Sequence, residues 1–549
     1  MNTRAIIRAM VGASIAIAHF SPGCASAPEL PSRQPVSKPA TEPKPGVVTV
    51  ESGELRGTPL EEVTRYLGVP YAAPPVGELR WRPPAPPLKW QGVRDASKPG
   101  YDCAQPNLGI FANFSGVEAR EDCLTVNIWA PNRTAGTAPV MVWLHPGALN
   151  FGSGSWPAFD GEQLARRGVV LVAINYRLGQ FGFFAHPALT KESADGLVGN
   201  YGFMDHLAAL EWIQRNIAAF GGDPANVTLF GASDGANTIA RLLTMPAAKG
   251  LFHKGILQSP LTLRQALPTL AEQEAVGKKF AESRGVTSDD PAALRALSME
   301  QVLLTTSDLE GALKGEAHSL GSLPSTRPMI DGKLITADVI DVFREQKQLA
   351  IPLIVGTNVK DLYQALPTVA DVLVLPFALN PEPILFAQLG PHRERIEKLY
   401  SSASPPSSVL SETIQIDRIG VMVRYLVDQM RRKGAAGYVY RFDAVASGFS
   451  GAIEHATHAA EIPYVFGTFE QVFGRKPPPS DREVSDRLQR YWVAFARSGN
   501  PNEAGLVEWP AYDLTVDQTL QITNELPVAL RALEQEKIVA YLDLLGLNK

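Results

Sequence analysis

The chain has 549 residues, of which 45% are hydrophobic and 19% are charged, a composition typical of a large folded unit and not of a disordered chain. Its formal net charge at pH 7 is only −5, and the sequence contains no block of Lys and Arg and no basic stripe interleaved with aromatic residues. These features argue against nucleic acid as a partner and favour a small or neutral ligand.

The N-terminus resembles an export signal. Arg4 and Arg8 precede an apolar run over 10–20, and small residues follow it, which predicts a signal peptide over residues 1–27. The apolar run is too short to span a bilayer. We therefore expect a protein exported to the periplasm or the medium, and the alternative is an outer-membrane lipoprotein with lipid attached to Cys24.

A proline-rich segment follows the signal. Residues 28–45 contain six prolines in eighteen positions, which is the composition of an extended, solvated linker. The folded domain is expected over residues 46–549, because no internal repeat or second low-complexity segment interrupts it. A domain of about 500 residues exceeds the usual size, so we expect a scaffold that carries long insertions.

Within this domain, short apolar runs alternate with helical periodicity. Leu207, Leu210, Ile213 and Ile217 recur at spacings of three and four, which predicts one face of a helix. The alternation predicts a mainly parallel α/β sheet with crossover helices, which binds ligands at the carboxyl ends of its strands. The runs that we interpret as buried strands are 140–144, 169–174, 227–230, 255–257, 351–355 and 438–442.

The run over 227–230 is followed at once by "GASDG", residues 231–235. This is the G-x-S-x-G pattern of a turn that exposes a nucleophilic serine between a strand and a helix. Glycines flank Ser233 at both ends because such a tight turn leaves no room for side chains there. A serine hydroxyl is a poor nucleophile without a base and an acid that orients the base, so an acid and then a histidine are expected later in the chain.

Longer segments in the chain point to a family. They occur in order and include "EDCLTVNIWAP", "VAINYRLGQFGFF", "EIPYVFG" and "YWVAFARSGNPN". With the serine turn, they resemble the type-B carboxylesterases, which include cholinesterases and para-nitrobenzyl esterases. The resemblance implies an α/β-hydrolase fold, with a mainly parallel central sheet flanked by helices and large insertions that form an active-site gorge. It also implies hydrolysis of carboxylic esters through an acyl-enzyme, with no cofactor and no metal.

The resemblance assigns three catalytic residues. Ser233 matches the nucleophile, His458 in "HAAEIPYVFG" the base, and Asp361 in "GTNVKDLYQAL" the acid. The family usually has glutamate at the acid position, and aspartate is one methylene shorter. Either the loop approaches His458 more closely or its hydrogen bond to the imidazole is longer. His455 lies at the wrong offset from "EIP" to be the base.

The resemblance places the oxyanion hole at the backbone N–H groups of Gly147, Ala148 and Asp234. Pro146 has no N–H, but it replaces a family glycine that does not donate. Asp234 stands where the family usually has alanine, and an ionised carboxylate there would oppose the oxyanion. Its side chain could point away, be protonated, or pair with a cation, for which His145 is one candidate.

The resemblance pairs Cys103 with Cys123 in a disulfide, which agrees with export. The alternative function is a non-catalytic binding protein of the same fold, as neuroligins are. The presence of both Ser233 and His458 favours the enzyme. Ala232 stands where cholinesterases have glutamate, so a choline ester is not favoured. We expect a small-molecule or oligomeric ester as substrate, and a monomer or weak homodimer.

Overall fold

The computed structural model describes residues 46–106, 115–132, 136–260, 263, 266–303, 327–361, 389–400, 407–447, 454–531, 533 and 535–547. The chain divides into the units Met1–Lys44 and Pro45–Lys549, and the fold below is that of the second. The signal and linker predicted over 1–27 and 28–45 lie outside the described residues, as does Cys24.

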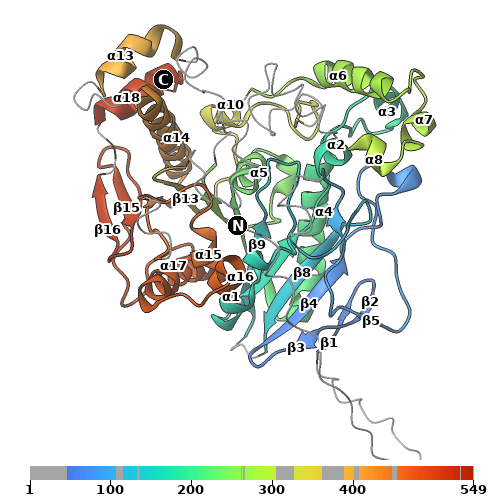
Figure 1. The fold of residues 1–549 in the computed structure, drawn as a ribbon, viewed down its shortest axis with the longest axis horizontal. Coiled ribbons are helices and arrows are strands. Elements are labelled where there is room, and N and C mark those ends of the chain that lie inside the picture. The colour runs from blue at the N-terminus through green and yellow to red at the C-terminus, as the bar shows by residue number, and fades with distance from the viewer. Residues whose placement is uncertain are drawn as a thin grey trace, which may run out of the picture. The chain divides into compact units, whose positions relative to one another are not determined.

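A large mixed sheet forms the centre of the second unit (Figure 1). Its strands are β3 (Thr58–Pro59), β4 (Val63–Pro70), β8 (Thr125–Pro131), β9 (Ala138–Leu144), β10 (Val170–Ile174), β11 (Gly222–Ala232), β12 (Lys254–Gln258), β13 (Leu353–Asn358), β14 (Gly437–Phe442), β15 (Gln518–Ile522) and β16 (Val528–Arg531). Their order is β16-β15-β14-β13-β12-β11-β9-β10-β8-β4-β3. The strands from β10 across to β15 pair in parallel, and the strands beyond each end pair antiparallel.

The six strands predicted from apolar runs are β9 to β14, so the prediction of a mainly parallel sheet is confirmed. All residues of β10 and of β12 are buried, which explains why parallel strands covered on both faces appear in the sequence as continuous apolar runs. The predicted helix is α4 (Tyr201–Asn216), which continues as a 3₁₀ turn over Ile217–Phe220.

Helices α5 (Asp234–Leu242) and α17 (Pro479–Ser498) cover opposite faces of the sheet. A Cβ on Gly255 of β12 would lie 3.4 Å from Ile239 of α5. Gln258 lies three residues further along the same strand, and its side chain accepts a hydrogen bond from Trp492 of α17 at 3.3 Å. Residues an odd number apart on a strand point to opposite faces, so the sheet is enclosed between the two helices.

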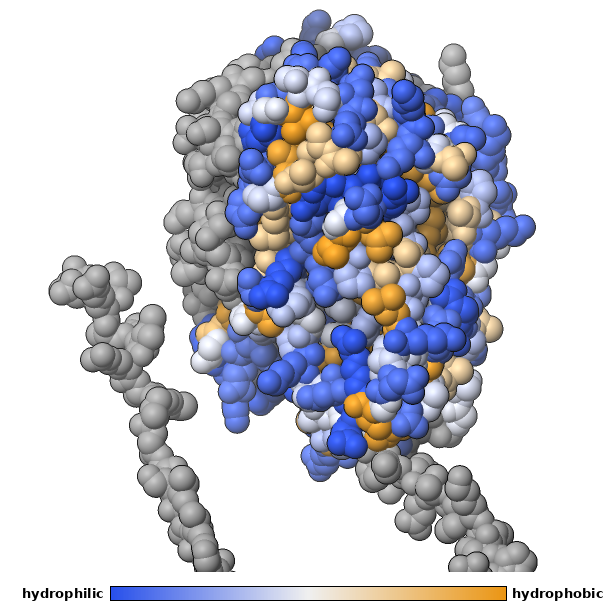
Figure 2. All heavy atoms as spheres, turned by 90° about the vertical axis from the view of Figure 1, so that its right-hand side faces the viewer, coloured by the Kyte–Doolittle hydropathy of each residue, from blue (hydrophilic) through white to orange (hydrophobic). Residues whose placement is uncertain are grey.

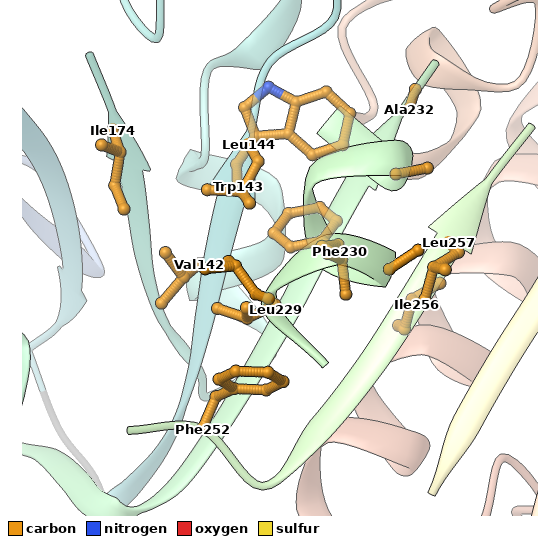
Figure 3. Packing of buried hydrophobic residues seen from close by; sticks show 14 of the residues in the cluster. Val142, Trp143, Leu144, Ile174, Leu229, Phe230, Ala232, Phe252, Ile256 and Leu257 are labelled. Carbon is orange, nitrogen blue, oxygen red and sulfur yellow. The ribbon is translucent and has the colours of Figure 1, made fainter. Parts of the chain in front are cut away.

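The core beside the serine turn is aromatic. Trp143 of β9 and Phe230 of β11 are paired across the two strands, and their ring centroids are 4.8 Å apart (Figure 3). Both rings also contact Phe466 of α15 (Ile462–Phe466). Large buried aromatic side chains dominate the energetics of such cores. This packing therefore fixes the end of β11, from which Ser233 follows directly.

Further helices and two small sheets surround the central sheet. They are α1 (Glu162–Arg166), α2 (Gly179–Gly182), α3 (Pro187–Glu192), α6 (Leu270–Ser283), α7 (Pro291–Arg295), α8 (Met299–Val302), α10 (Val339–Arg344), α13 (Arg393–Lys398), α14 (Ser407–Arg432), α16 (Phe469–Phe473), α18 (Gln535–Leu544), the small sheet of β1 (Val47–Val50), β2 (Gly53–Arg56) and β5 (Val93–Asp95), and the pair β6 (Asp102–Cys103) and β7 (Ala119–Arg120). Hydrophilic side chains cover most of the face in Figure 2, with apolar ones in small separate groups. No helix within the described ranges is long and apolar enough to cross a membrane.

Candidate active site

Ser233 occupies a strained turn at the carboxyl end of β11. Its φ is 55° and its ψ is −123°, a region that residues other than glycine rarely adopt and that persists only where the surroundings enforce it. Ser233 N–H donates to the carbonyl of Gln258 on β12 at 2.8 Å. Ser233 is partly exposed, whereas its neighbours Ala232 and Asp234 are buried. The turn therefore presents the hydroxyl at the sheet's ligand-binding edge.

The two glycines of the turn are required by close contacts. A Cβ on Gly235 would lie 2.0 Å from the carbonyl oxygen of Leu144 on β9. A Cβ on Gly231 would lie 2.8 Å from that same oxygen and 2.8 Å from the backbone of Gly235. The prediction that no side chain fits two residues before or after Ser233 is thus confirmed. Any substitution of Gly231 or Gly235 must displace backbone.

The predicted acid and base meet in the structure. Oδ1 of Asp361 lies 2.7 Å from Nδ1 of His458, and Oδ2 accepts the N–H of Asn358 at 2.9 Å. A short parallel bridge between Lys360 and Thr457, with Lys360 N–H donating to the carbonyl of Ala456 at 2.8 Å, brings the two loops together. The aspartate side chain, although shorter than glutamate, therefore reaches His458 with a hydrogen bond of ordinary length.

His458 lies in a negatively charged environment. Its side chain is 11% exposed. Burial alone would lower the pKa of His458, but the hydrogen bond and charge of Asp361, with smaller contributions from Glu461 and Asp234, raise it above its usual value. The interaction with Asp234 also shows that His458 lies near the residue after Ser233. The imidazolium form is therefore stabilised at this position.

His455 has a different environment, as the sequence predicted. Its Nδ1 lies 3.0 Å from Oδ1 of Asp443, and its side chain is 43% exposed. Asp443 also accepts the N–H of Ala456 at 3.1 Å. His455 therefore contacts a carboxylate of its own and does not contact Asp361.

The predicted oxyanion donors lie on an unusual turn. Gly147, Ala148 and Leu149 have φ values of 140°, 52° and 59° in succession. The carbonyl of Gly147 accepts the N–H groups of Asn150 and Phe151 at 2.9 and 3.0 Å, which closes the turn. A Cβ on Gly147 would lie 1.8 Å from the carbonyl oxygen of Phe151. Only glycine fits at this position, whereas the next two residues carry backbone strain.

Asp234 is the first residue of α5, so its N–H has no partner in the helix's own hydrogen-bond ladder. Its side chain is 8% exposed, and Oδ1 accepts from the amide of Asn237 at 3.2 Å. Burial raises the pKa of Asp234, and the charges of Arg241 and His458 and the hydrogen bond from Asn237 oppose that rise. Oδ1 of Asp234 is thus hydrogen-bonded within its own helix, and Arg241 supplies a nearby positive charge.

His145 is not the cation that balances Asp234, so that hypothesis is wrong. Its ring stacks on Tyr176 with centroids 4.6 Å apart, and burial lowers the pKa of His145 to about 4. It is therefore neutral near pH 7. Arg241, two turns along α5, supplies the positive charge near Asp234 that local sequence spacing did not reveal.

Comparison with known proteins agrees with this geometry. Residues 44–379 and 396–539 match the carboxylesterase family model. The chain is 35% identical over 492 residues to the fumonisin B1 esterase of Sphingopyxis macrogoltabida, an alignment that covers 87% of this chain and 86% of that protein. The para-nitrobenzyl esterase of Bacillus subtilis (strain 168) is 34% identical over 497 residues, with 88% and 96% covered. A solved PNB esterase structure has a TM-score of 0.78 at 32% identity and covers 90% of this chain and 99% of its own.

The chain belongs to the carboxylesterase family. The predicted α/β-hydrolase fold and the predicted serine carboxylic-ester hydrolase are both confirmed, since the relatives and structural neighbours are esterases of that fold.

Sequence reasoning missed three polar residues at the site of this carboxylesterase. Glu461 is fully buried, and its oxygens accept from the side-chain amides of Gln258 and Asn358 at 3.0 and 2.6 Å. Burial raises the pKa of Glu461, the hydrogen bond from Asn358 opposes this rise, and the charge of Asp361 adds to it. Gln258 and Asn358 end apolar strands, and that polar ending was the available signal.

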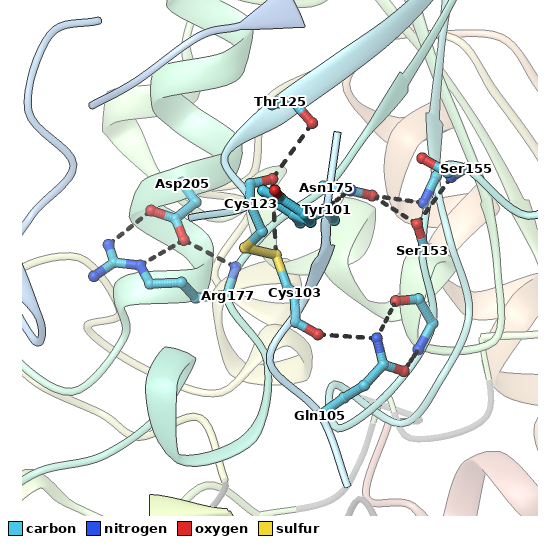
Figure 4. The surroundings of a disulfide bond; sticks show 12 residues. Tyr101, Cys103, Gln105, Cys123, Thr125, Ser153, Ser155, Asn175, Arg177 and Asp205 are labelled. Carbon is cyan, nitrogen blue, oxygen red and sulfur yellow. Dashed lines mark hydrogen bonds and ion pairs between the residues drawn. A yellow bond between two sulfur atoms is a disulfide. The ribbon is translucent and has the colours of Figure 1, made fainter. Parts of the chain in front are cut away.

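Figure 4 shows the surroundings of the disulfide bond of the carboxylesterase. Cys103 and Cys123 are bonded to each other and both are buried. The side chain of Gln105 donates to the carbonyls of Cys103 and Gly152 at 3.0 and 3.1 Å and accepts the N–H of Gly152 at 2.9 Å. Gln105 therefore links the disulfide to the segment that follows the turn. Among the residues that the structure describes, no group of His, Cys, Asp and Glu could hold a metal ion.

Proposed function

We propose that Ser233, His458 and Asp361 are the catalytic residues of this carboxylesterase, acting as nucleophile, base and orienting acid. The observations that carry the proposal are the 2.7 Å contact between Nδ1 of His458 and Asp361 and the strained turn at Ser233. When Nδ1–H donates to the carboxylate, Nε2 keeps its lone pair and is the nitrogen that can accept the serine proton.

The reaction that this arrangement supports has two halves. Ser233 attacks the ester carbonyl while His458 takes the hydroxyl proton, and the imidazolium then protonates the departing alcohol. Water next attacks the acyl-enzyme with His458 again as base, which releases the acid and restores Ser233. We assign stabilisation of both tetrahedral intermediates to the N–H groups of Gly147, Ala148 and Asp234.

The test is hydrolysis of short p-nitrophenyl esters by the purified protein and by Ser233→Ala, with burst and steady-state phases recorded. We expect kcat to fall by about 10⁶-fold in the variant. We also expect an organophosphonate to label Ser233 in the wild type alone. Equal turnover in both proteins, or no turnover and no labelling of the wild type, would overturn the assignment. The second of these results would favour a non-catalytic binding protein.

We propose that the substrate is a small-molecule or oligomeric ester, and the natural ester is sought with a panel. The panel should include fumonisin B1 and p-nitrobenzyl esters, because relatives of the chain are named for acting on them. Comparison of kcat/KM values identifies the preferred ester class, since discrimination between substrates is set by that ratio.

We also propose that residues 1–27 are removed as an export signal, that 28–45 form a linker, and that 46–549 form the esterase domain. A disulfide in the esterase domain supports this proposal, because such bonds persist mainly in oxidising compartments. N-terminal sequencing of the mature protein and fatty-acid labelling of wild type and Cys24→Ser distinguish secretion from lipid anchoring. Sedimentation analysis then tests the expected monomer or weak homodimer.

A further inference from the structure

Glu461 is a buried carboxylate that the mechanism above does not use. It lies three residues after His458, at the start of α15, and its exposed fraction is 0%. Oε1 accepts from Nε2 of Gln258 at 3.0 Å, and Oε2 accepts from Nδ2 of Asn358 at 2.6 Å. No Lys or Arg forms an ion pair with it in the described part of the chain.

Both amides that Glu461 holds are joined to catalytic residues. The backbone carbonyl of Gln258 accepts the N–H of Ser233 at 2.8 Å. The backbone N–H of Asn358 donates to Asp361 at 2.9 Å. Nδ2 of Asn358 also donates to the carbonyl of Thr457 at 2.7 Å, directly before His458. One carboxylate thus connects the strand end beside the nucleophile, the strand end before the acid, and the loop of the base.

We propose that Glu461 is a positioning residue that holds Ser233, Asp361 and His458 in their mutual geometry through Gln258 and Asn358. The proposal rests on the catalytic roles proposed above. A buried carboxylate with only neutral donors is costly unless its hydrogen bonds are well formed. Here both oxygens are satisfied, and the donors come from β12 and β13, two strands whose ends must stay in register for catalysis.

The charge of Glu461 gives the proposal a distinctive readout. Three titratable groups interact electrostatically with Glu461. They are His458 on its own loop, Asp361 on the acid loop and Tyr440 on β14. Asp361, Glu461 and Asp234 together favour the imidazolium form of His458. The base acts in its neutral form, so kcat/KM rises with pH as His458 loses its proton. Removing the charge of Glu461 lowers the pKa of His458 and moves that acid limb to lower pH.

The test compares Glu461→Gln with Asp481→Asn in the full chain. Asp481 is a matched control, since it is 1% exposed, accepts two hydrogen bonds from Ser447 at 3.0 and 2.8 Å, and is not among the charges that shift the pKa of His458. For Glu461→Gln we expect kcat to fall by about 10²-fold, as for a misplaced catalytic group, with little change in KM and an acid limb at lower pH. For Asp481→Asn we expect reduced thermal stability with an unmoved acid limb.

A reciprocal exchange separates positioning from general destabilisation. Combining Gln258→Glu with Glu461→Gln restores a donor and an acceptor at each contact, and we expect it to recover at least tenfold of the lost kcat. A wild-type kcat in Glu461→Gln, or a loss that the exchange does not recover, overturns the proposal. If Glu461→Gln does not fold, Glu461→Asp, which shortens the reach, takes its place with the same expected loss of kcat, and a wild-type kcat in that variant overturns the proposal. Ser233→Ala, assayed alongside, tests the catalytic assignment separately, because retained turnover there refutes the proposed mechanism itself.

Discussion

The proposed site has an acid–base side, formed by Asp361 and His458, and an oxyanion side, formed by Gly147, Ala148 and Asp234. The two sides accommodate unusual residues differently. On the acid–base side, Asp361 stands where the family usually has glutamate, and both of its oxygens are hydrogen-bonded at 2.7 and 2.9 Å. On the oxyanion side, Gly147 to Leu149 form a turn with three successive positive φ values, and Asp234 is a buried carboxylate near the proposed hole.

The difference shows how this fold accommodates residues that depart from the family's usual ones. At Asp361 the shorter side chain still reaches His458, because the backbone bridge between Lys360 and Thr457 holds the two loops together. At Asp234 the change is an added charge, on a residue whose N–H is a proposed donor of the hole. Its side chain is instead directed to Asn237, with Arg241 as counter-charge. The shorter side chain is therefore accommodated by a backbone contact between two loops, and the added charge by neighbouring side chains.

The largest effect outside Ser233 is expected on the acid–base side. Asp361→Asn presents an amide to Nδ1 of His458 and favours the wrong tautomer, so kcat should fall by about 10⁴-fold. Asp361→Glu keeps the charge but adds a methylene where Oδ1 is already 2.7 Å from the ring, and we expect a smaller loss. Steady-state kinetics with p-nitrophenyl esters measures both, and an Asp361→Asn variant within tenfold of wild type would contradict the assigned role.

On the oxyanion side, Gly147→Ala adds a single methyl group and should cause the largest loss of kcat. Its Cβ would lie 1.8 Å from the carbonyl oxygen of Phe151, so the turn must shift and displace a donor. Loss of one donor costs about 10²- to 10³-fold in kcat. Gly250→Ala is the control, because Gly250 also has a positive φ of 82° but open space around it. Similar kcat values for the two variants would show that Gly147 does not shape the hole.

A smaller effect is expected at Asp234. Its charge raises the pKa of His458, so Asp234→Ala and Asp234→Asn should both lower that pKa. Because the proposed base would act in its neutral form, the acid limb of kcat/KM should move to lower pH. The maximal rate should change by less than about tenfold, since the N–H donor is kept. An unmoved acid limb in both variants would mean that the Asp234 carboxyl is already neutral over that pH range.

Much of the fold could be predicted because buried parallel strands leave continuous apolar runs. The antiparallel strands β4 and β8 and the edge pair β15 and β16 were not predicted. β15 has an exposed first residue and a half-buried fourth one, and no residue of β16 is buried, which gives a weaker signal. The turn at Ser233 was predictable from local steric limits, since its two glycines are demanded by contacts within and beside the turn.

The rest of the site depends on residues far apart in the chain. Asp361 and His458 are 97 positions apart, and only the family resemblance paired them before the structure did. The roles of Gln258, Asn358 and Glu461 in one buried network could not be predicted, because spacing along the sequence does not show which strand ends face each other. The pairing of Asp234 with His145 failed for a different reason, since burial lowers the pKa of His145 to about 4 and keeps its ring neutral, which the local sequence does not show.

The smallest effect is expected for His455→Ala, because His455 lies outside the acid–base side. His455 is three residues from His458, but its 3.0 Å contact is with Asp443, and its side chain is 43% exposed. Exposed ion pairs contribute about 0–1 kcal/mol, so His455→Ala should change the free energy of unfolding by less than about 1 kcal/mol and leave kcat/KM unchanged. His458→Ala, its matched partner, should lose about 10⁶-fold in kcat. Chemical denaturation and ester kinetics on both proteins make the measurement. A tenfold loss of kcat/KM in His455→Ala would show that the contact between His455 and Asp443 contributes to catalysis. The geometry argues against this, because Asp443 contacts neither Asp361 nor Glu461 in the described part of the chain.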